Sequence, residues 1–486
     1  GENVDGAHSG KIVVVSEGDL LLDAGNDNHA FSQIGHGGAD VPENHSGDIV
    51  VSVDGDIELR SGSGGGNRYA AIGHGDGNNN ANNVHDGSMM IRANGEVSLV
   101  NNGDDVQITH FDAFAAGNNY AFVAEGLDTA TGNSGLNNIT ITYGIWNAYE
   151  AILNNGGEAT IGALGAGNLI MQANAAAAYT STADLNLLSQ KNITFLEGVQ
   201  NAGTGSVNVV AGWDGLGFAP TAGFMGGGVT PLGHGDLDMN YCPPFSTAYD
   251  FTLNKTAAGV VDPTTFGLNS GSVFIGNGTQ TAGIFVGSRD GNTNILGYGV
   301  DILGSNSTGN LAQVGFNAPA AGGDATGNIM VETKEDGLTM TANANNAYAL
   351  VGHGGIGGTG NATGMIRVDT THGTTAGDII MNSGGGTTAF TQIGHGGAGF
   401  NGNHGAAGAT QLLEVVGRNI DLNAGGGNDS FARIGHGGRG ITGSMAGDIS
   451  VTVENGGAVT LDGGGGSNAQ AQIGLGGVAV DGTKDG

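Results

Sequence analysis

A short motif, an isoleucine or valine followed by Gly-His-Gly, returns along the chain at intervals of about 40 residues or a multiple of that interval. It reads Q-I-G-H-G-G at 33–38 and 392–397, A-I-G-H-G at 71–75 and R-I-G-H-G-G at 433–438, with the variants L-V-G-H-G-G at 350–355 and Q-I-G-L-G-G at 472–477. Self-similarity at a period of a few tens of residues is typical of repeat proteins, whose units bury their apolar faces by stacking on one another. We therefore expect one stacked array.

Each repeat contains three short segments in which apolar and polar residues alternate, and Gly or Asn pairs separate these segments. Alternation over four to six residues indicates a half-buried strand, and Asp-Gly or Gly-Asn pairs favour turns. The segments lie at 49–53, 57–59 and 70–72 in one repeat and at 449–453, 459–461 and 471–473 in the last. The pattern predicts an all-β chain, a parallel β-helix (β-solenoid) of about eleven three-strand coils with loops that leave one corner.

The motif divides the chain into three parts. Regular coils are expected over 1–100 and 346–486, and degenerate coils over 101–345, where the strand pattern continues without the histidine. Within that centre, residues 224–270 look like an insertion, and they contain the single cysteine, Cys242.

The chain is strongly acidic: its 13 Lys and Arg against 45 Asp and Glu give a formal net charge of -32. Nucleic acids and anionic membrane surfaces repel such a chain, so neither is an expected partner. One cysteine rules out an intramolecular disulfide framework, and no apolar run of about 18 residues predicts a membrane-spanning helix. We interpret Gly1 as an internal or processed end of a longer polypeptide.

Residues 205–215, G-S-V-N-V-V-A-G-W-D-G, resemble a recurring signature of filamentous-haemagglutinin-type exoproteins, the large products of two-partner secretion. The Ile-Gly-His-Gly-Gly units are similar to repeats of giant bacterial surface proteins of the same broad type. The resemblance implies a right-handed β-helix in an extracellular fibre or adhesin at the cell surface. The N-P-N-G motif of that family's secretion domain is absent, so the resemblance places this segment downstream of the targeting domain.

A histidine recurs at one position of the repeat. Two interpretations stay open: a ladder in which each neutral ring donates to one backbone group and accepts from another, or a metal site shared between adjacent coils. Leu475 occupies the same position in the last repeat and favours the ladder. The column comprises His36, His74, His353, His395 and His436.

An aromatic residue precedes the isoleucine or valine of the motif by three positions, and by alternation it points away from the aliphatic core. Such rings stack on sugars, bury against a neighbouring chain, or lie beneath a loop that folds back over them. The column comprises Phe31, Tyr69, Tyr348, Phe390 and Phe431, and Tyr120 is assigned to it as well.

Carboxylates and amides in the turns raise the question of calcium. Residues 26–28 and 428–429 lie in glycine-rich turns, but the calcium-binding nonapeptide spacing does not recur. For Asp48, Asp378 and Asp448, which precede strands, a turn role is the expected one. We predict no cofactor beyond loosely bound Ca²⁺ on the acidic surface.

No catalytic motif accompanies the repeats, and the basic residues are scattered, so we expect no enzyme. The predicted function is a segment of an extracellular structural fibre, with a scaffolding or adhesive role and end-to-end or lateral self-association. An alternative is a glycan-binding adhesin that uses the aromatic column and the loops, and a less favoured one is a polysaccharide-degrading β-helix enzyme.

Overall fold

The computed structural model describes the chain except for residues 1–5, 39–40, 42, 64–65, 76–82, 112, 119, 129–137, 173–177, 214–270, 279, 281, 305–308, 310, 318–322, 406–411, 482 and 486. The expected insertion at 224–270, including Cys242, lies outside the described residues.

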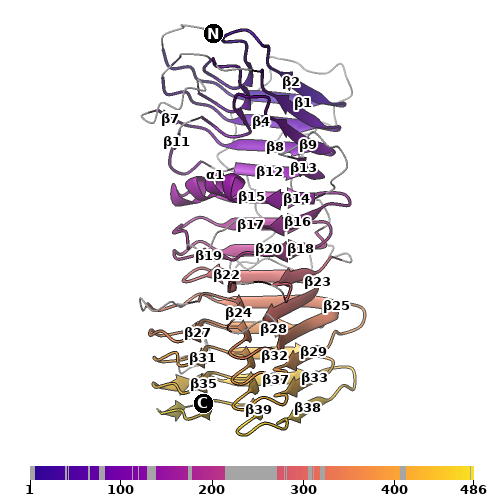
Figure 1. Ribbon diagram of the computed structural model, residues 1–486, viewed down its shortest axis with the longest axis vertical. Helices are drawn as coiled ribbons and strands as arrows, with labels where there is room; N and C mark the ends of the chain where they lie inside the picture. The colour runs from indigo at the N-terminus through magenta and orange to yellow at the C-terminus, as the bar shows by residue number, and fades with distance from the viewer. Residues whose placement is uncertain are drawn as a thin grey trace, which may run out of the picture.

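The chain is mostly β-structure with 3% helix, and a large all-parallel sheet curls 318° around an axis. Successive repeats stack as layers along the long axis, with the N-terminus at one end and the C-terminus at the other (Figure 1). Each layer contributes a strand to each of two columns. The first column contains β1 (Ile12–Ser16), β4 (Ile49–Val53), β8 (Met89–Ala93), β12 (Tyr120–Ala124), β15 (Ala159–Ala163), β17 (Leu185–Ser189), β20 (Val207–Ala211), the starts of β23 (Thr293–Gly304) and β25 (Ile329–Ala342), β28 (Ile366–Asp369), β32 (Leu413–Gly417) and β37 (Ile449–Val453).

The second column joins the first through β23 and β25, which bend from one column into the other. It contains β2 (Leu20–Asp23), β5 (Ile57–Arg60), β9 (Glu96–Val100), β13 (Gly126–Asp128), β14 (Asn138–Ile141), β16 (Asn168–Met171), β18 (Ile193–Phe195), β21 (Val273–Ile275), the ends of β23 and β25, β29 (Ile379–Asn382), β33 (Ile420–Asn423) and β38 (Val459–Asp462). The strand β14 is an addition, because β12 pairs directly with β15 in the first column.

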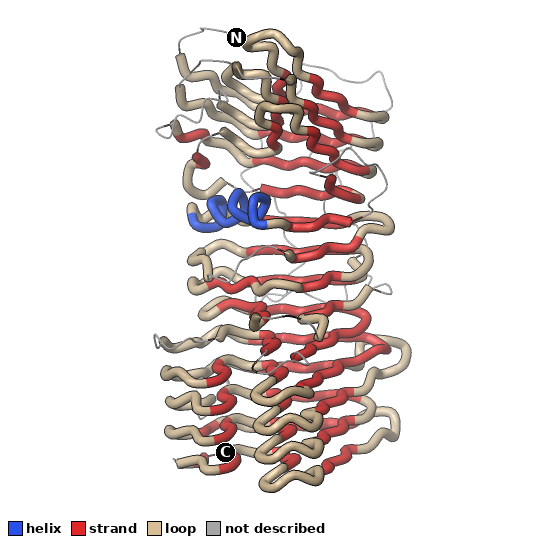
Figure 2. Tube along the Cα trace, viewed as in Figure 1, coloured by secondary structure: helices blue, strands red, loops and turns tan. Residues whose placement is uncertain are grey.

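Shorter strands complete the layers (Figure 2). A third column contains β3 (Ser32–Ile34), β6 (Ala70–Ile72) and β10 (Val106–Gln107) near the N-terminus, and β19 (Val199–Asn201), β22 (Ile284–Ser288), β24 (Leu311–Val314), β26 (Tyr348–Val351), β30 (Phe390–Ile393), β34 (Phe431–Ile434) and β39 (Gln470–Ile473) beyond the centre. A fourth contains β27 (Gly354–Ile356), β31 (Gly396–Ala398), β35 (Gly437–Arg439) and β40 (Gly476–Val478), and two small pairs join β7 (Val84–His85) to β11 (Ala113–Phe114) and β36 (Met445–Ala446) to β41 (Lys484–Asp485).

The pairing register keeps like residues above like. Ile49 pairs with Met89, and Leu185 pairs with Val207, so the inward side chains form continuous aliphatic rows. These side chains are almost completely buried in a single cluster that runs the length of the stack. Burial of such rows is the dominant favourable term in folding, and no layer can achieve it alone.

The centre departs from the regular layers through α1 (Tyr143–Asn154), which follows the additional strand β14. Trp146, Ile152 and Leu153 of this helix join the main core. At this layer the helix therefore covers the aliphatic rows where regular layers have a strand. No helix among the described residues has the length and apolar character needed to cross a membrane.

Candidate functional site

The motif histidines stack ring on ring in two groups. His36, His74 and His110 have centroid distances of 5.0 and 4.6 Å, and their planes are nearly parallel. The same arrangement joins His353 to His395 at 5.2 Å and His395 to His436 at 5.0 Å. His110 was not expected in this column, because Thr109 replaces the glycine of the motif; the surviving signal is the I-x-H spacing.

Both ring nitrogens are used in His74, His110, His353 and His395, whereas Nε2 of His436 finds no hydrogen-bond partner among the described residues. In His74, Nδ1 accepts a hydrogen bond from the backbone N–H of His36 at 2.9 Å, and Nε2 lies 2.7 Å from the carbonyl oxygen of Gly47. His395 repeats the arrangement, with Nδ1 accepting from the His353 N–H and Nε2 facing the Gly364 carbonyl. An acceptor at Nδ1 and a carbonyl at Nε2 assign the neutral tautomer with the proton on Nε2. Each ring therefore joins three chain segments.

Burial makes this neutral form persistent. Desolvation lowers the pKa of His74, His353 and His436 to about 4, and it holds the pKa of His395 well below the usual range. A metal ion at either nitrogen of His74, His353 or His395 would displace one of the hydrogen bonds of the ladder. Among the described residues, no group of three or more His, Cys, Asp or Glu side chains is arranged to hold a metal ion.

A second histidine column runs beside the first near the N-terminus. His8 stacks on His45 at 5.1 Å, and His45 stacks on His85 at 5.5 Å. The backbone N–H of His8 donates to Nδ1 of His45, and that of His45 donates to Nδ1 of His85, as in the first histidine column. The edge of His85 meets His74 at 6.4 Å. This column was missed in the sequence, although an H-x-G tripeptide precedes the first strand of each of these layers.

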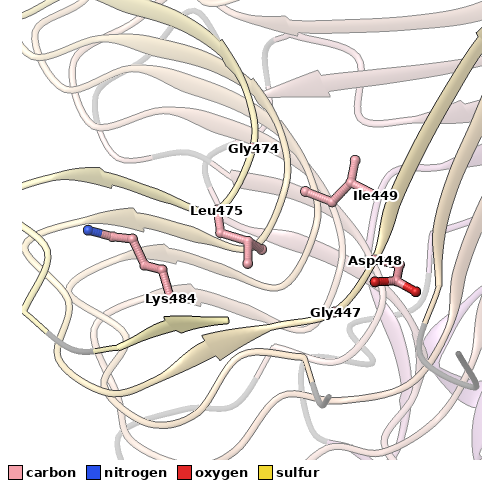
Figure 3. A pocket seen from close by; sticks show the side chains of 6 residues that line it. All are labelled: Gly447, Asp448, Ile449, Gly474, Leu475 and Lys484. Atoms are coloured by element: carbon pink, nitrogen blue, oxygen red, sulfur yellow. The ribbon is translucent and has the colours of Figure 1, made fainter. Parts of the chain in front are cut away.

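The first histidine column ends in the last layer, where Leu475 takes the position that His436 holds in the layer before. Beside it, Gly447, Asp448, Ile449, Gly474 and Lys484 line an open cavity of about 560 Å³ on the last layer (Figure 3). Leu475 lies between Lys484 and Ile449 in this view. The lining combines one carboxylate, one ammonium group and aliphatic carbon.

The aromatic column also stacks, and its rings are buried. Tyr348, Phe390 and Phe431 lie 4.9 and 4.6 Å apart in nearly parallel planes, and each is at most 1% exposed. They form a cluster separate from the main core, as their outward direction requires. The fourth-column strands cover them: the Tyr348 hydroxyl lies 2.8 Å from the position of a Cβ added to Gly355 in β27. The loop after the motif thus folds back and encloses a second, lateral compartment.

The aromatic rings near the N-terminus also stack, but the assignment of Tyr120 to this column is wrong. Phe31 stacks on Tyr69 at 5.0 Å, and Tyr69 meets Phe111 edge-on at 4.8 Å. Tyr120 does not belong to the outward column. It pairs with Met89 and Ala159 in the first column of strands and points into the main core, because β12 is the first strand of its layer and not a third-column strand.

The turn carboxylates and amides cap backbone groups of the following layer. Asp48 accepts from the Ser88 N–H, Asn26 from the Ser63 N–H and Asn428 from the Ser467 N–H, at 2.9–3.0 Å. Asp378 accepts from Asn419 and forms two contacts of 2.8 Å with Arg418, which lower the pKa of the carboxyl. These oxygens therefore serve the turns.

A cluster of charged residues lies on the outer face of β25, β28 and β32. Arg367 contacts the carboxylates of Glu332 at 3.5 Å and Asp369 at 2.8 Å, and it reaches Glu414 at 3.3 Å in the next layer. His372, from the turn that follows β28, lies 3.3 Å from Glu332, and this contact raises the pKa of His372. The cluster was not foreseen, because only the register brings these positions together. The charged cluster links the turn at 370–378 to the layers of β25, β28 and β32.

Comparison of this chain with protein-family models, with curated proteins and with solved structures found no match.

Proposed function

We propose that this chain is a right-handed parallel β-helix and a structural segment of an extracellular bacterial fibre, in which layers continue end to end from one unit to the next. The observation that carries the proposal is the exposure of apolar side chains on the last layer. Val459 and Leu461 are 41% and 46% exposed, whereas the residues they pair with, Ile420 and Leu422, are buried. Apolar residues directed at the core thus form an uncovered end face.

The first layer offers a matching surface. Ile12, Val14 and Leu20 belong to the same aliphatic rows but are only partly buried. The third strand ends alike in the first and last layers, with Gln33-Ile34-Gly35 in one and Gln472-Ile473-Gly474 in the other. Unpaired strand edges with exposed apolar rows are templates for further pairing. An end-to-end contact between two copies would repeat the contact that already joins each pair of layers.

The charge of the chain fits an extended particle in a salt-containing medium. A net charge of -32 keeps rods apart at low ionic strength, and salt screens that repulsion over about 8–10 Å. The extracellular location rests on the resemblance of residues 205–215 to filamentous-haemagglutinin-type exoproteins.

The two alternatives have less support. Sugar stacking needs accessible ring faces, and Tyr348, Phe390 and Phe431 are enclosed in the lateral compartment. A polysaccharide-degrading enzyme needs carboxylates that are free to act on a substrate, and in the charged cluster Glu332 and Asp369 contact Arg367 and His372.

Sedimentation velocity at physiological salt tests the proposal. We expect the chain to form elongated oligomers whose size grows with concentration, and the double variant Val459→Asp, Leu461→Asp to remain monomeric because it places charge on the end face. Ile356→Asp is the matched control, since Ile356 is 44% exposed on a lateral strand and away from the ends. A parent chain that stays monomeric throughout, or an end-face variant that assembles like the parent, would contradict the proposal.

A further inference from the structure

Arg433 is a buried cation within the lateral compartment. It lies on β34 and is 0% exposed, and its Nε, Nη1 and Nη2 atoms find no hydrogen-bond partner in the part of the chain that the structure describes. Its guanidinium packs 4.9 Å from the centre of the Phe431 ring and against β40, where a Cβ added to Gly477 would lie 2.5 Å from Nη2. A guanidinium carries five N–H donors, so several remain unused.

The neighbours of Arg433 also hold unused polar atoms. The register places Arg433 between Gln392 and Gln472, one strand away on each side. Within the described residues, Oε1 of both glutamines and Nε2 of Gln470 find no hydrogen-bond partner, although these atoms are buried. Buried unsatisfied groups in native proteins generally indicate a bound water or ion.

Other layers show how the polar side chains of this compartment usually find hydrogen-bond partners. There a glutamine holds the position of Arg433, and a tyrosine of the aromatic column donates to its oxygen: Tyr69 to Gln33, and Tyr348 to Gln313. At the layers of Gln392 and Arg433 the aromatic residue is Phe390 or Phe431, which has no hydroxyl. The compartment therefore loses a donor at two successive layers and gains a positive charge at one of them.

No carboxylate approaches Arg433 within 4.0 Å among the described residues, since the ion pairs found there involve other arginines, such as that of Arg439 with Asp429. Burial lowers the pKa of Arg433 only to about 10, so the side chain stays charged at neutral pH. An isolated charge in a dry interior is strongly disfavoured unless an opposite charge compensates it.

We propose that the compartment around Arg433 binds a small monovalent inorganic anion of the chloride type. The guanidinium donates to the anion, and the Nε2 of Gln470 supplies a further donor. A monatomic anion suits a compartment in which the guanidinium already fills the space that a Cβ at Gly477 would take. This site is independent of the proposed fibre role.

Thermal unfolding of the full chain in sodium chloride, against sodium gluconate at equal ionic strength, tests the site. We expect chloride to raise the unfolding temperature saturably by about 2–4 °C. Arg433→Gln, which restores the residue found at 33, 392 and 472, should abolish the difference. An equal chloride effect in both proteins, or none in the parent, would overturn the proposal.

A second measurement tests the site without a variant, in case Arg433→Gln does not fold. Crystals of the parent chain grown in sodium bromide should give an anomalous peak beside the Arg433 guanidinium. Absence of a peak there, at a bromide concentration that marks other sites, would overturn the proposal.

Discussion

The layers at the two ends and the layers in the centre have the same main core but differ in the length of the chain outside it and in its polar ladders. At the ends, successive layers are about 40 residues apart, as between His45 and His85, and the extra chain builds the lateral compartment with its histidine and aromatic stacks. In the centre, Asn186 and Asn208 are 22 residues apart, and described residues 111–352 contain no histidine. The aliphatic rows are therefore sufficient for stacking, and the Gly-His-Gly motif encodes the lateral compartment.

The centre uses a different polar ladder. Asn208 donates to Asn186 at 2.8 Å and accepts from Asn294 at 2.7 Å, and all three side chains are buried on the outer face of the first column. An amide ladder carries no titratable proton, whereas a histidine ladder does. The two regions should consequently differ in their response to acid.

Acid should produce the largest difference between the regions. The pKa of a buried ladder histidine such as His353 is about 4 in the folded chain, below the unfolded value of about 6.5. The unfolded state therefore binds more protons between these values, and stability is lost as pH falls from about 6.5 to about 4, by ~3 kcal/mol for each fully buried ring. Amide hydrogen exchange at pH 4.5 should show β30 and β34 opening before β17 and β20. Equal loss of protection in both regions would refute the assignment of neutral histidines.

A smaller but local effect is expected from a side chain at Gly394. This residue has φ of 143°, and an added Cβ would lie 2.2 Å from the carbonyl oxygen of Gly435 in the next layer. Gly394→Ala should cost about 3 kcal/mol or more, because the backbone of two layers must separate. Gly385→Ala is the control, since no atom lies within 4 Å of its Cβ position. Urea unfolding of both variants gives the comparison, and similar stabilities would show that the layer spacing is adaptable.

Removal of one aromatic ring tests whether the lateral compartment stabilises the ends. Phe390→Ala deletes the middle ring of the stack and should cost about 3–4 kcal/mol. Tyr348→Phe, which removes only the hydroxyl bonded to Gln313, should cost about 1 kcal/mol. Urea unfolding measures both. A loss below 1 kcal/mol for Phe390→Ala would mean that the compartment contributes little to stability.

The smallest effect is expected in the centre. Asn208→Ala leaves Oδ1 of Asn186 and Nδ2 of Asn294 without their ladder partner and should cost about 1–3 kcal/mol, with no dependence on pH between 4 and 7. Denaturation of the variant and its parent at both pH values provides the test. A pH-dependent cost would indicate that charged groups near the ladder set its strength.

Much of the stack could be predicted from the sequence, because alternation at 49–53 and 449–453 sets which side chains face inward. Alternation also separated the aromatic column from the aliphatic core, yet it left open whether a loop covers the rings. Glycine-rich chain such as 394–399 carries no periodic signal, so the strands β27, β31, β35 and β40 were not foreseen.

Features that depend on register were beyond local patterns. Glu332 comes from another layer than Arg367 and Asp369, and only the pairing of β25 with β28 brings it to them. Tyr120 was misplaced because its spacing from Val123 imitates the motif, while its strand occupies another column. The buried Arg433 is one letter in a motif that otherwise has glutamine, alanine or leucine there, and its lack of a partner becomes visible only in three dimensions.

Cryo-electron microscopy of the assembled chain tests whether layers continue from one unit into the next. We expect rods in which β37 and β38 of one copy stack on β1 and β2 of the following copy with unbroken strand spacing. Single rods whose end layers stay uncovered at high protein concentration would contradict it.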